Sequence, residues 1–212
     1  LFYLNIAVVV GLIGYKIYLN LVTSEFEAEH TEQLSDISAR LEGQDSYSFA
    51  VVGNINNSVG IFERRIIPML NDTDIDFLVS AGNAVSSGGE DKYRAIKGTL
   101  SRLDMPYLLT FGNNEYEEFG SFRFYDHYGP HFFSFTADDS RFIFLDSTGK
   151  TPWQWQLRWL TDILKADDSK HRFVFIGHPP LEPEEEFFLA QEDDFLQPME
   201  FRHALLQTIS NF

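Results

Sequence analysis

Three short stretches of this chain are the most informative about its fold: Val52-Gly53-Asn54-Ile55-Asn56, Ala81-Gly82-Asn83-Ala84-Val85 and Phe111-Gly112-Asn113-Asn114-Glu115. Each stretch follows a short apolar run, has a glycine where the run ends, and continues into polar residues. Short apolar runs bounded by turn residues are typical of strands that are buried on both faces. In open α/β sheets, ligands bind outside the carboxyl ends of the strands, so the asparagines at these ends are candidate site residues.

The segments around these clusters predict an alternation of strands and helices. Between the clusters, apolar residues recur at helical spacing, and two later alternating runs joined by Ala137-Asp138-Asp139-Ser140 predict a β-hairpin. The order of the elements predicts an α/β fold in which two sheets form a sandwich flanked by helices. The predicted elements are strands at 47–53, 75–81 and 107–111 separated by helices at 59–70 and 90–103, hairpin strands at 131–136 and 141–146, a helix at 153–164 and a strand at 172–177.

A fourth strand-end cluster, Gly177-His178-Pro179-Pro180, completes a pattern that resembles the calcineurin-like metallophosphoesterases, close to their purple-acid-phosphatase-like branch. The motifs of that family are, in order, D-x-H, G-D, G-N-H-[DE], a strand-end His and G-H-x-H. The resemblance covers residues 47–181 and implies the two-sheet α/β sandwich of the metallophosphoesterase type. Supporting matches outside the clusters are Tyr125-Asp126-His127-Tyr128-Gly129-Pro130, Phe144-Leu145-Asp146-Ser147 and Gln156-Leu157-Arg158-Trp159-Leu160.

The resemblance identifies metal-ligand positions at which this chain carries asparagine. Asn54 and Asn56 stand where the family has a metal-binding Asp and a metal-binding His. Asn83 stands at the position of the Asp that bridges the two metals of the family site. These three residues, together with Asn113 and His178, are therefore predicted to be vestigial metal positions or part of a ligand cleft.

The remaining family positions are partly retained. Asn113 is the family's own Asn ligand, and His178 matches a retained metal-ligand His. Asn114 replaces the His that protonates or stabilises the leaving oxygen, so it is a vestigial catalytic position. The last G-H-x-H motif is not found in residues 181–212, where His203 lacks both the Gly and the second His. Glu115 is the one carboxylate within the clusters.

These replacements weaken the expected chemistry. A two-metal phosphoesterase balances two divalent cations with carboxylates, whereas amide oxygens are neutral and bind hard cations only beside charged or more numerous oxygen ligands. Loss of the general acid at position 114 costs roughly 10²–10⁴ in rate. We therefore expect no catalytic residue and no bound metal, although an intact family site would hold two divalent metals. Singly, each Asn after a Gly is also ordinary turn chemistry.

Composition excludes some classes of partner. The chain has 32 Asp and Glu against 16 Lys and Arg, for a formal net charge of -16. This balance argues against nucleic acid as a partner, because phosphate backbones are bound by Lys and Arg. The chain has no cysteine, which excludes a disulfide framework and a thiolate metal site.

The N-terminal segment, residues 1–22, predicts a single transmembrane helix. It is apolar apart from Asn5, Lys16 and Asn20, and a helix of this length spans about 33 Å. The following residues do not match the small-residue cleavage pattern of a secretory signal peptide. Acidic rather than basic residues follow the segment as far as Arg40, so we expect the soluble domain outside the cytoplasm.

Residues 23–46 predict a stalk helix and a linker. Ser24-Glu25-Phe26-Glu27 has the form of a capping box, and Gly43 is placed to end the helix. Leu34, Ile37 and Leu41 fall on one helical face, which could pair with another subunit or pack on its own domain.

The function hypothesis combines these features. Residues 47–212 are expected to form a metallophosphoesterase-like domain that is incomplete at its C-terminus and belongs to a longer polypeptide. The leading interpretation is a membrane-anchored, catalytically inactive accessory or scaffold subunit of a membrane complex, with other membrane-protein subunits as partners. One alternative is an active phosphoester hydrolase with an altered site, such as one metal held by Asn83, Asn113 and His178. Another is a binding module without metal, since amides both donate and accept hydrogen bonds.

Overall fold

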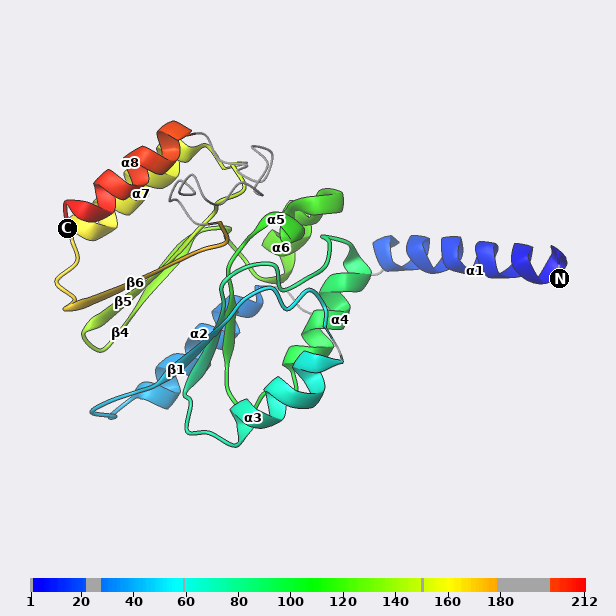
Figure 1. Cartoon of the computed structure of the whole chain (residues 1–212), viewed down its shortest axis with the longest axis horizontal. Helices are drawn as coiled ribbons and strands as arrows, with labels where there is room; N and C mark the ends of the chain where they lie inside the picture. The colour runs from blue at the N-terminus through cyan, green and yellow to red at the C-terminus, as the bar shows by residue number, and fades with distance from the viewer. Residues whose placement is uncertain (1, 22–27, 59, 150, 179–198) are drawn as a thin grey trace, which may run out of the picture.

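Two three-stranded sheets form the centre of the molecule, a computed structural model that describes residues 2–21, 28–58, 60–149, 151–178 and 199–212 (Figure 1). In the first sheet, β1 (Phe49–Val52), β2 (Phe77–Ser80) and β3 (Tyr107–Leu109) are parallel and lie in that order. In the second sheet, β4 (Phe133–Ala137) is antiparallel to β5 (Ser140–Leu145), which is parallel to β6 (His171–Ile176). The predicted mixed α/β fold with two sheets is therefore confirmed.

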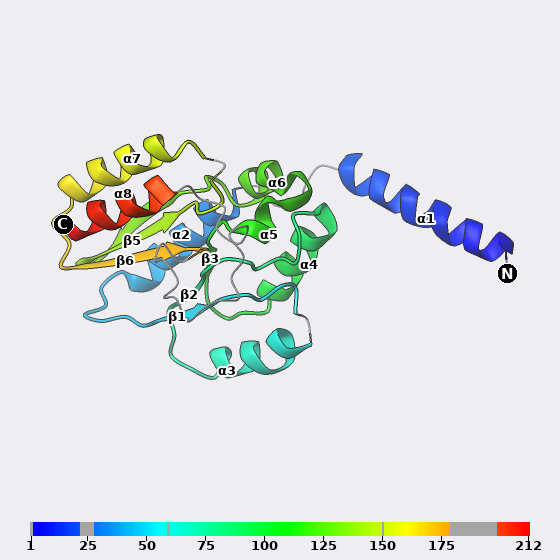
Figure 2. The same ribbon diagram turned by 45° about the horizontal axis from the view of Figure 1, so that its top comes forward.

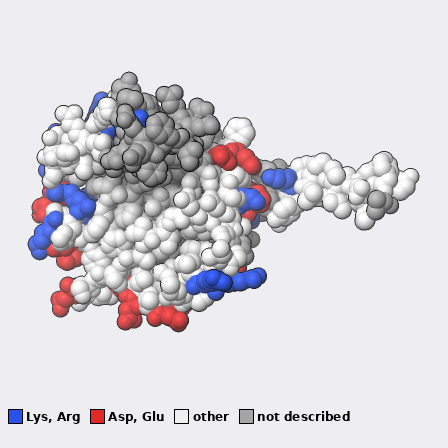
Figure 3. Space-filling model, viewed as in Figure 1, with Lys and Arg blue, Asp and Glu red and all other residues white. Residues whose placement is uncertain are grey.

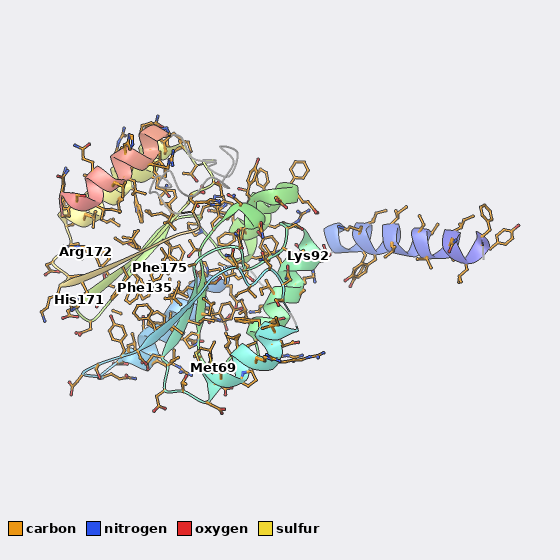
Figure 4. All side chains as sticks on the ribbon, in the orientation of Figure 1. Met69, Lys92, Phe135, His171, Arg172 and Phe175 are labelled. Carbon is orange, nitrogen blue, oxygen red and sulfur yellow. The ribbon has the colours of Figure 1, made fainter. Side chains whose placement is uncertain are left out.

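A layer of aromatic side chains fills the space between the sheets. Alternate residues of a strand point to the same face of its sheet. Phe77 of β2 and Phe142 of β5 point to the faces that meet, and both are 0% exposed. Their ring centroids are 5.3 Å apart in an edge-to-face arrangement. Figure 4 shows Phe135 and Phe175 in the same layer, whereas His171 and Arg172 lie at the outer end of β6.

Helices cover the outer faces of both sheets. The helix predicted at 59–70 is divided into a π-helical turn, η1 (Phe62–Ile66), and α3 (Ile67–Asn71), because Pro68 has no N–H to continue the ladder. On the first sheet, α3 and α4 (Glu90–Leu100) enclose buried residues that include Leu78, Tyr93 and Ile96. On the second sheet, α7 (Trp153–Lys165) and α8 (Met199–Ser210) pack together over β5 and β6. The short elements α5 (Asn113–Tyr116), η2 (Glu117–Phe119) and α6 (Gly120–His127) follow β3.

Helix α2 (Glu29–Leu41) is part of the domain. Ile37 is 1% exposed in the layer between the sheets, and two polar side chains accept hydrogen bonds from the unpaired edge of β3. The N–H of Tyr107 donates to Oε1 of Gln33 at 2.9 Å, and the N–H of Leu109 donates to Nε2 of His30 at 3.0 Å. Of the two alternatives for this helix, packing on its own domain is the one observed. The suggested capping box at 24–27 lies outside the described residues.

Helix α1 (Phe2–Leu21) forms where the sequence predicts a membrane segment. It projects from the domain, and in Figure 3 most of its surface carries no charged side chain. Lys16 lies near its base, with Nζ 3.7 Å from Oδ1 of Asp91 in α4. In the part of the chain that the structure describes, however, no helix is both long enough and apolar enough to cross a bilayer. The predicted transmembrane span is thus not supported.

Candidate functional site: a cluster of asparagines

The carboxyl ends of strands from both sheets meet at one place. The register of the first sheet pairs Val52 with Ser80 and Ser80 with Leu109, so the loops that follow these strands start side by side. The loop after β6 joins them through glycines: a Cβ atom on Gly82 would lie 3.0 Å from Cα of Gly177. The sequence-predicted coincidence of four strand ends is therefore present in the fold.

The asparagines in these loops bind one another. Nδ2 of Asn83 donates to Oδ1 of Asn54 at 2.9 Å, and Nδ2 of Asn114 donates to Oδ1 of Asn56 at 2.7 Å. The backbone N–H of Asn114 donates to Oδ1 of Asn83 at 3.2 Å. Four of the predicted positions, which come from three separate loops, thus form one connected network of amides.

Three of these four asparagines have their backbone in the left-handed region. The φ angles are +53° at Asn54, +52° at Asn56 and +54° at Asn83. Asn enters this region more readily than most residues with a side chain. Asn54, Asn56 and Asn83 therefore have the backbone that is typical of Asn in turns, and their side chains also belong to the amide network.

Asn57 follows Asn56 in the same loop and ties that loop to other backbone groups, although the sequence motifs do not point to it. Its φ is also +52°, its Oδ1 accepts the N–H of Ser86 at 2.7 Å, and its Nδ2 donates to the carbonyl of Lys92 at 2.9 Å. The signal that could have found it is the presence of three asparagines among residues 54–57.

Asn113 and His178 form a second pair beside the network. Nδ2 of Asn113 lies 2.9 Å from Nε2 of His178, so the ring nitrogen accepts this hydrogen bond. Oδ1 of Asn113 is buried and has no hydrogen-bond partner among the described residues. The N–H of His178 donates to Oγ of Ser147 at 3.1 Å. His203, by contrast, lies on α8, which packs over the second sheet.

Glu115 positions the loop that carries Asn83. Its carboxylate is 0% exposed and accepts the N–H groups of Asn83, Ala84 and Val85 at 3.1, 2.6 and 3.3 Å. Burial raises the pKa of this carboxyl to about 7, although the backbone hydrogen bonds act in the opposite direction. Its oxygens are turned toward the backbone of the loop, so Glu115 acts as a structural anchor.

The donor set does not fit the two divalent metals of a phosphoesterase. Among the described residues, no group of three or more His, Cys, Asp or Glu side chains is placed to hold a metal ion. The side-chain oxygens of Asn54, Asn56 and Asn83 already accept N–H groups within the network. Neutral amides that bind one another cannot balance about four positive charges.

Comparison with known proteins agrees with the fold. A family model described as calcineurin-like phosphoesterase matches residues 33–201. The chain therefore belongs to the calcineurin-like phosphoesterase family. A protein of Fibrobacter succinogenes (strain ATCC 19169 / S85), named as a probable cyclic nucleotide phosphodiesterase, is 27% identical over 111 residues, which are 50% of this chain and 43% of that protein. This chain thus matches less than half the length of that relative. The narrower resemblance to the purple-acid-phosphatase-like branch stays a prediction.

Proposed function

We propose that this chain is a non-catalytic member of its family that serves as an accessory or scaffold subunit. The observation that supports the proposal is the cluster of asparagines at the strand ends, where amide–amide hydrogen bonds join the loops. A two-metal hydrolase needs carboxylates to hold its metals and a base or acid close to the reacting oxygen. Position 114, where the family has its His, carries an amide whose Nδ2 is shared between Asn56 and the carbonyl of Val85.

The direct test is metal content and turnover of the purified chain. We expect metal analysis to find less than one tightly bound Mn²⁺, Fe or Zn²⁺ per chain, and no hydrolysis of bis-p-nitrophenyl phosphate. Cyclic nucleotides should be tested as well, because the relative from Fibrobacter succinogenes is named as their phosphodiesterase. Two tightly bound metals together with turnover would refute the proposal.

A reversion variant serves as the matched control for this test. The substitutions Asn54→Asp, Asn56→His, Asn83→Asp and Asn114→His restore the family's residue types at four positions of the cluster. We expect this variant to bind divalent metal and to hydrolyse bis-p-nitrophenyl phosphate at a detectable rate. If the wild-type chain and the variant both bind metal equally well, the asparagines do not account for the lost chemistry.

We further propose that α1 attaches the domain to a membrane or to a membrane-protein partner. The large apolar side chains of this helix, from Phe2 to Tyr18, are between 46% and 83% exposed. A helix that is apolar on all sides needs an apolar environment around it. Replacement of Val9 and Ile13 by Lys should release the full chain from membranes in a flotation experiment, and unchanged flotation would contradict this attachment.

A further inference from the structure

Three aromatic side chains at the start of α6 and along it are exposed. Phe119, which precedes the helix, is 81% exposed, and Phe122 and Tyr125 within it are 75% and 58% exposed. Phe122 and Tyr125 are three apart in the helix and therefore lie on the same face. We call these two side chains, together with Phe119 at the residue before the helix, the aromatic face. Figures 1 and 2 both place α6 beside α5, on the side of the domain from which α1 projects.

The backbone that carries the aromatic face is held in an unfavourable conformation. Glu118 and Phe119 have φ angles of +51° and +65°, which residues with side chains rarely adopt. Arg123 stabilises this turn, because its guanidinium donates to the carbonyl of Glu118 and to that of Gly88, the latter at 2.9 Å. Such strained positions persist where the surroundings fix them, and they cluster at functional sites.

Close backbone packing beneath the turn keeps it in place. A Cβ atom on Gly120 would lie 2.0 Å from the carbonyl oxygen of Glu115 and 2.5 Å from Cα of Gly88. The start of α6 is therefore pressed against the loop before α4, and Phe119 is directed outward by a rigid support. A ring presented in this way loses little conformational freedom when it is covered by a partner.

The fully exposed charged side chains next to the aromatic face are acidic, whereas Arg123 of α6 is partly buried against the carbonyls of Gly88 and Glu118. Glu117, Glu118 and Asp126 are exposed beside it, and the whole chain has a formal net charge of -16. Anionic lipid would be repelled by this rim, whereas a partner with Lys or Arg around an apolar centre would be attracted. Exposed aromatic residues with a polar rim are typical of protein–protein interfaces.

We propose that the aromatic face is a docking surface for a protein segment that presents apolar side chains flanked by Lys or Arg. The inference rests on the proposed accessory function, which requires a partner, and it identifies the chemistry of that partner. Phe119 and Phe122 are the anchors of the surface, and the acidic rim steers the basic segment to them.

The experiment uses the full chain and defined probes. The first probe is a short labelled helical peptide with Leu on one face and Lys on the other, the second has Glu in place of every Lys, and the third is a vesicle of neutral phosphatidylcholine. The test variant combines Phe119→Asn with Phe122→Ser, because Asn tolerates the left-handed backbone at 119. Trp155→Ser, at a position on α7 that is 66% exposed, is the matched control.

We expect the Lys peptide to bind the wild-type chain and the Trp155→Ser variant equally. Its affinity should fall at least about tenfold in the test variant, since aromatic anchors dominate interfaces of this kind. The Glu peptide should not bind, and added salt should weaken the Lys complex. A urea-unfolding midpoint equal to that of the wild-type chain shows that the double variant is folded. If the midpoint is lower, the single variant Phe122→Ser is used in place of the double variant.

Several outcomes would overturn the inference. They are an undetectable complex with the Lys peptide, equal affinity for the wild-type chain and the test variant, or binding of vesicles that depends on Phe119 and Phe122. The last result would assign the aromatic face to lipid. Peptide binding to the aromatic face does not depend on the asparagines at the strand ends. Turnover of a phosphoester by the wild-type chain would therefore refute the proposed function, but it would not change the peptide-binding result.

Discussion

At the scale of residues, the side-chain amide of Asn83 joins two loops. Its Nδ2 donates to Asn54 and its Oδ1 accepts from Asn114, so a single side chain connects the ends of β1 and β3 across β2. An aspartate has the same size and the same tolerance for a positive φ, but it has no N–H to donate. Comparison of these two residue types therefore isolates the contribution of the amide.

We expect Asn83→Asp to lower the free energy of unfolding by about 1–3 kcal/mol, because two oxygens would face each other where a hydrogen bond now lies. Urea unfolding at pH 7 measures this change. Asn211→Asp, at an exposed position near the C-terminal end, is the control and should change the free energy by less than about 0.5 kcal/mol. Equal stability of both variants would show that the amide does not tie the loops.

At the scale of elements, α2 closes one edge of the first sheet. The helix satisfies N–H groups of β3 through His30 and Gln33, and a covered edge cannot pair with another strand. Burial lowers the pKa of His30 to about 3, so the imidazole is neutral when it accepts the N–H of Leu109. The contact between this helix and this strand should therefore depend on pH.

The sign of that dependence follows from the lowered pKa. Below pH 6.5 the unfolded chain takes up a proton on His30 and the folded chain does not, so stability from this residue is complete above pH 6.5 and is lost as the pH falls toward 3. We expect the contribution of His30 to the free energy of unfolding to fall by about 2 kcal/mol between pH 7 and pH 5. The raised pKa of Glu115 acts in the opposite sense over part of this range, with stability lost as the pH rises toward 7.

The variant His30→Gln separates the two effects. Gln supplies an uncharged oxygen acceptor for the N–H of Leu109, and it leaves Glu115 unchanged. The difference in unfolding free energy between the wild-type chain and this variant should therefore shift by about 2 kcal/mol from pH 7 to pH 5. A difference that is constant with pH would contradict the buried neutral state of His30.

At the scale of the whole molecule, stability should not depend on metal. Ligands that bind the folded state raise the unfolding temperature, and their removal lowers it. We expect EDTA and added Mn²⁺ to leave the unfolding midpoint of the wild-type chain within about 1 °C. Mn²⁺ should raise the midpoint of the reversion variant described above. If EDTA clearly lowered the unfolding midpoint of the wild-type chain, the chain would hold a bound metal that its asparagines and His178 do not predict.

The sequence predicts the parts of the fold that have local signals. The apolar runs at 47–53, 75–81 and 107–111 contain the observed strands, and the glycines after them mark the strand ends that meet. The contacts of α2 with β3 could not be predicted, because they join residues more than 70 positions apart, such as His30 and Leu109. The π-helical turn before Pro68 and the exposed rings of α6 likewise depend on tertiary packing.

The sequence predicts more of the site than of the fold, because the family motifs fix the order of the site residues. Those motifs identify Asn54, Asn56, Asn83, Asn114 and the pair of Asn113 with His178, which the structure brings together. They do not show that the amides bind one another, since hydrogen-bond direction depends on side-chain geometry. The anchoring role of Glu115 is also absent from the sequence, because its three N–H partners lie in another loop.

The glycines at the strand ends let the loops of the two sheets approach each other closely. Phenylalanine rings separate the sheets along most of their length, but at the site the loops approach through bare backbone, and a Cβ atom on Gly177 would lie 3.2 Å from Cα of Gly112. The site therefore rests on close backbone packing. In Gly177→Ala the new Cβ atom would lie 3.1 Å from Oγ of Ser147 and 3.2 Å from Cα of Gly112, so these neighbours would have to shift by a few tenths of an ångström. The placement of His178 against Asn113 thus depends in part on glycines that make no polar side-chain contact.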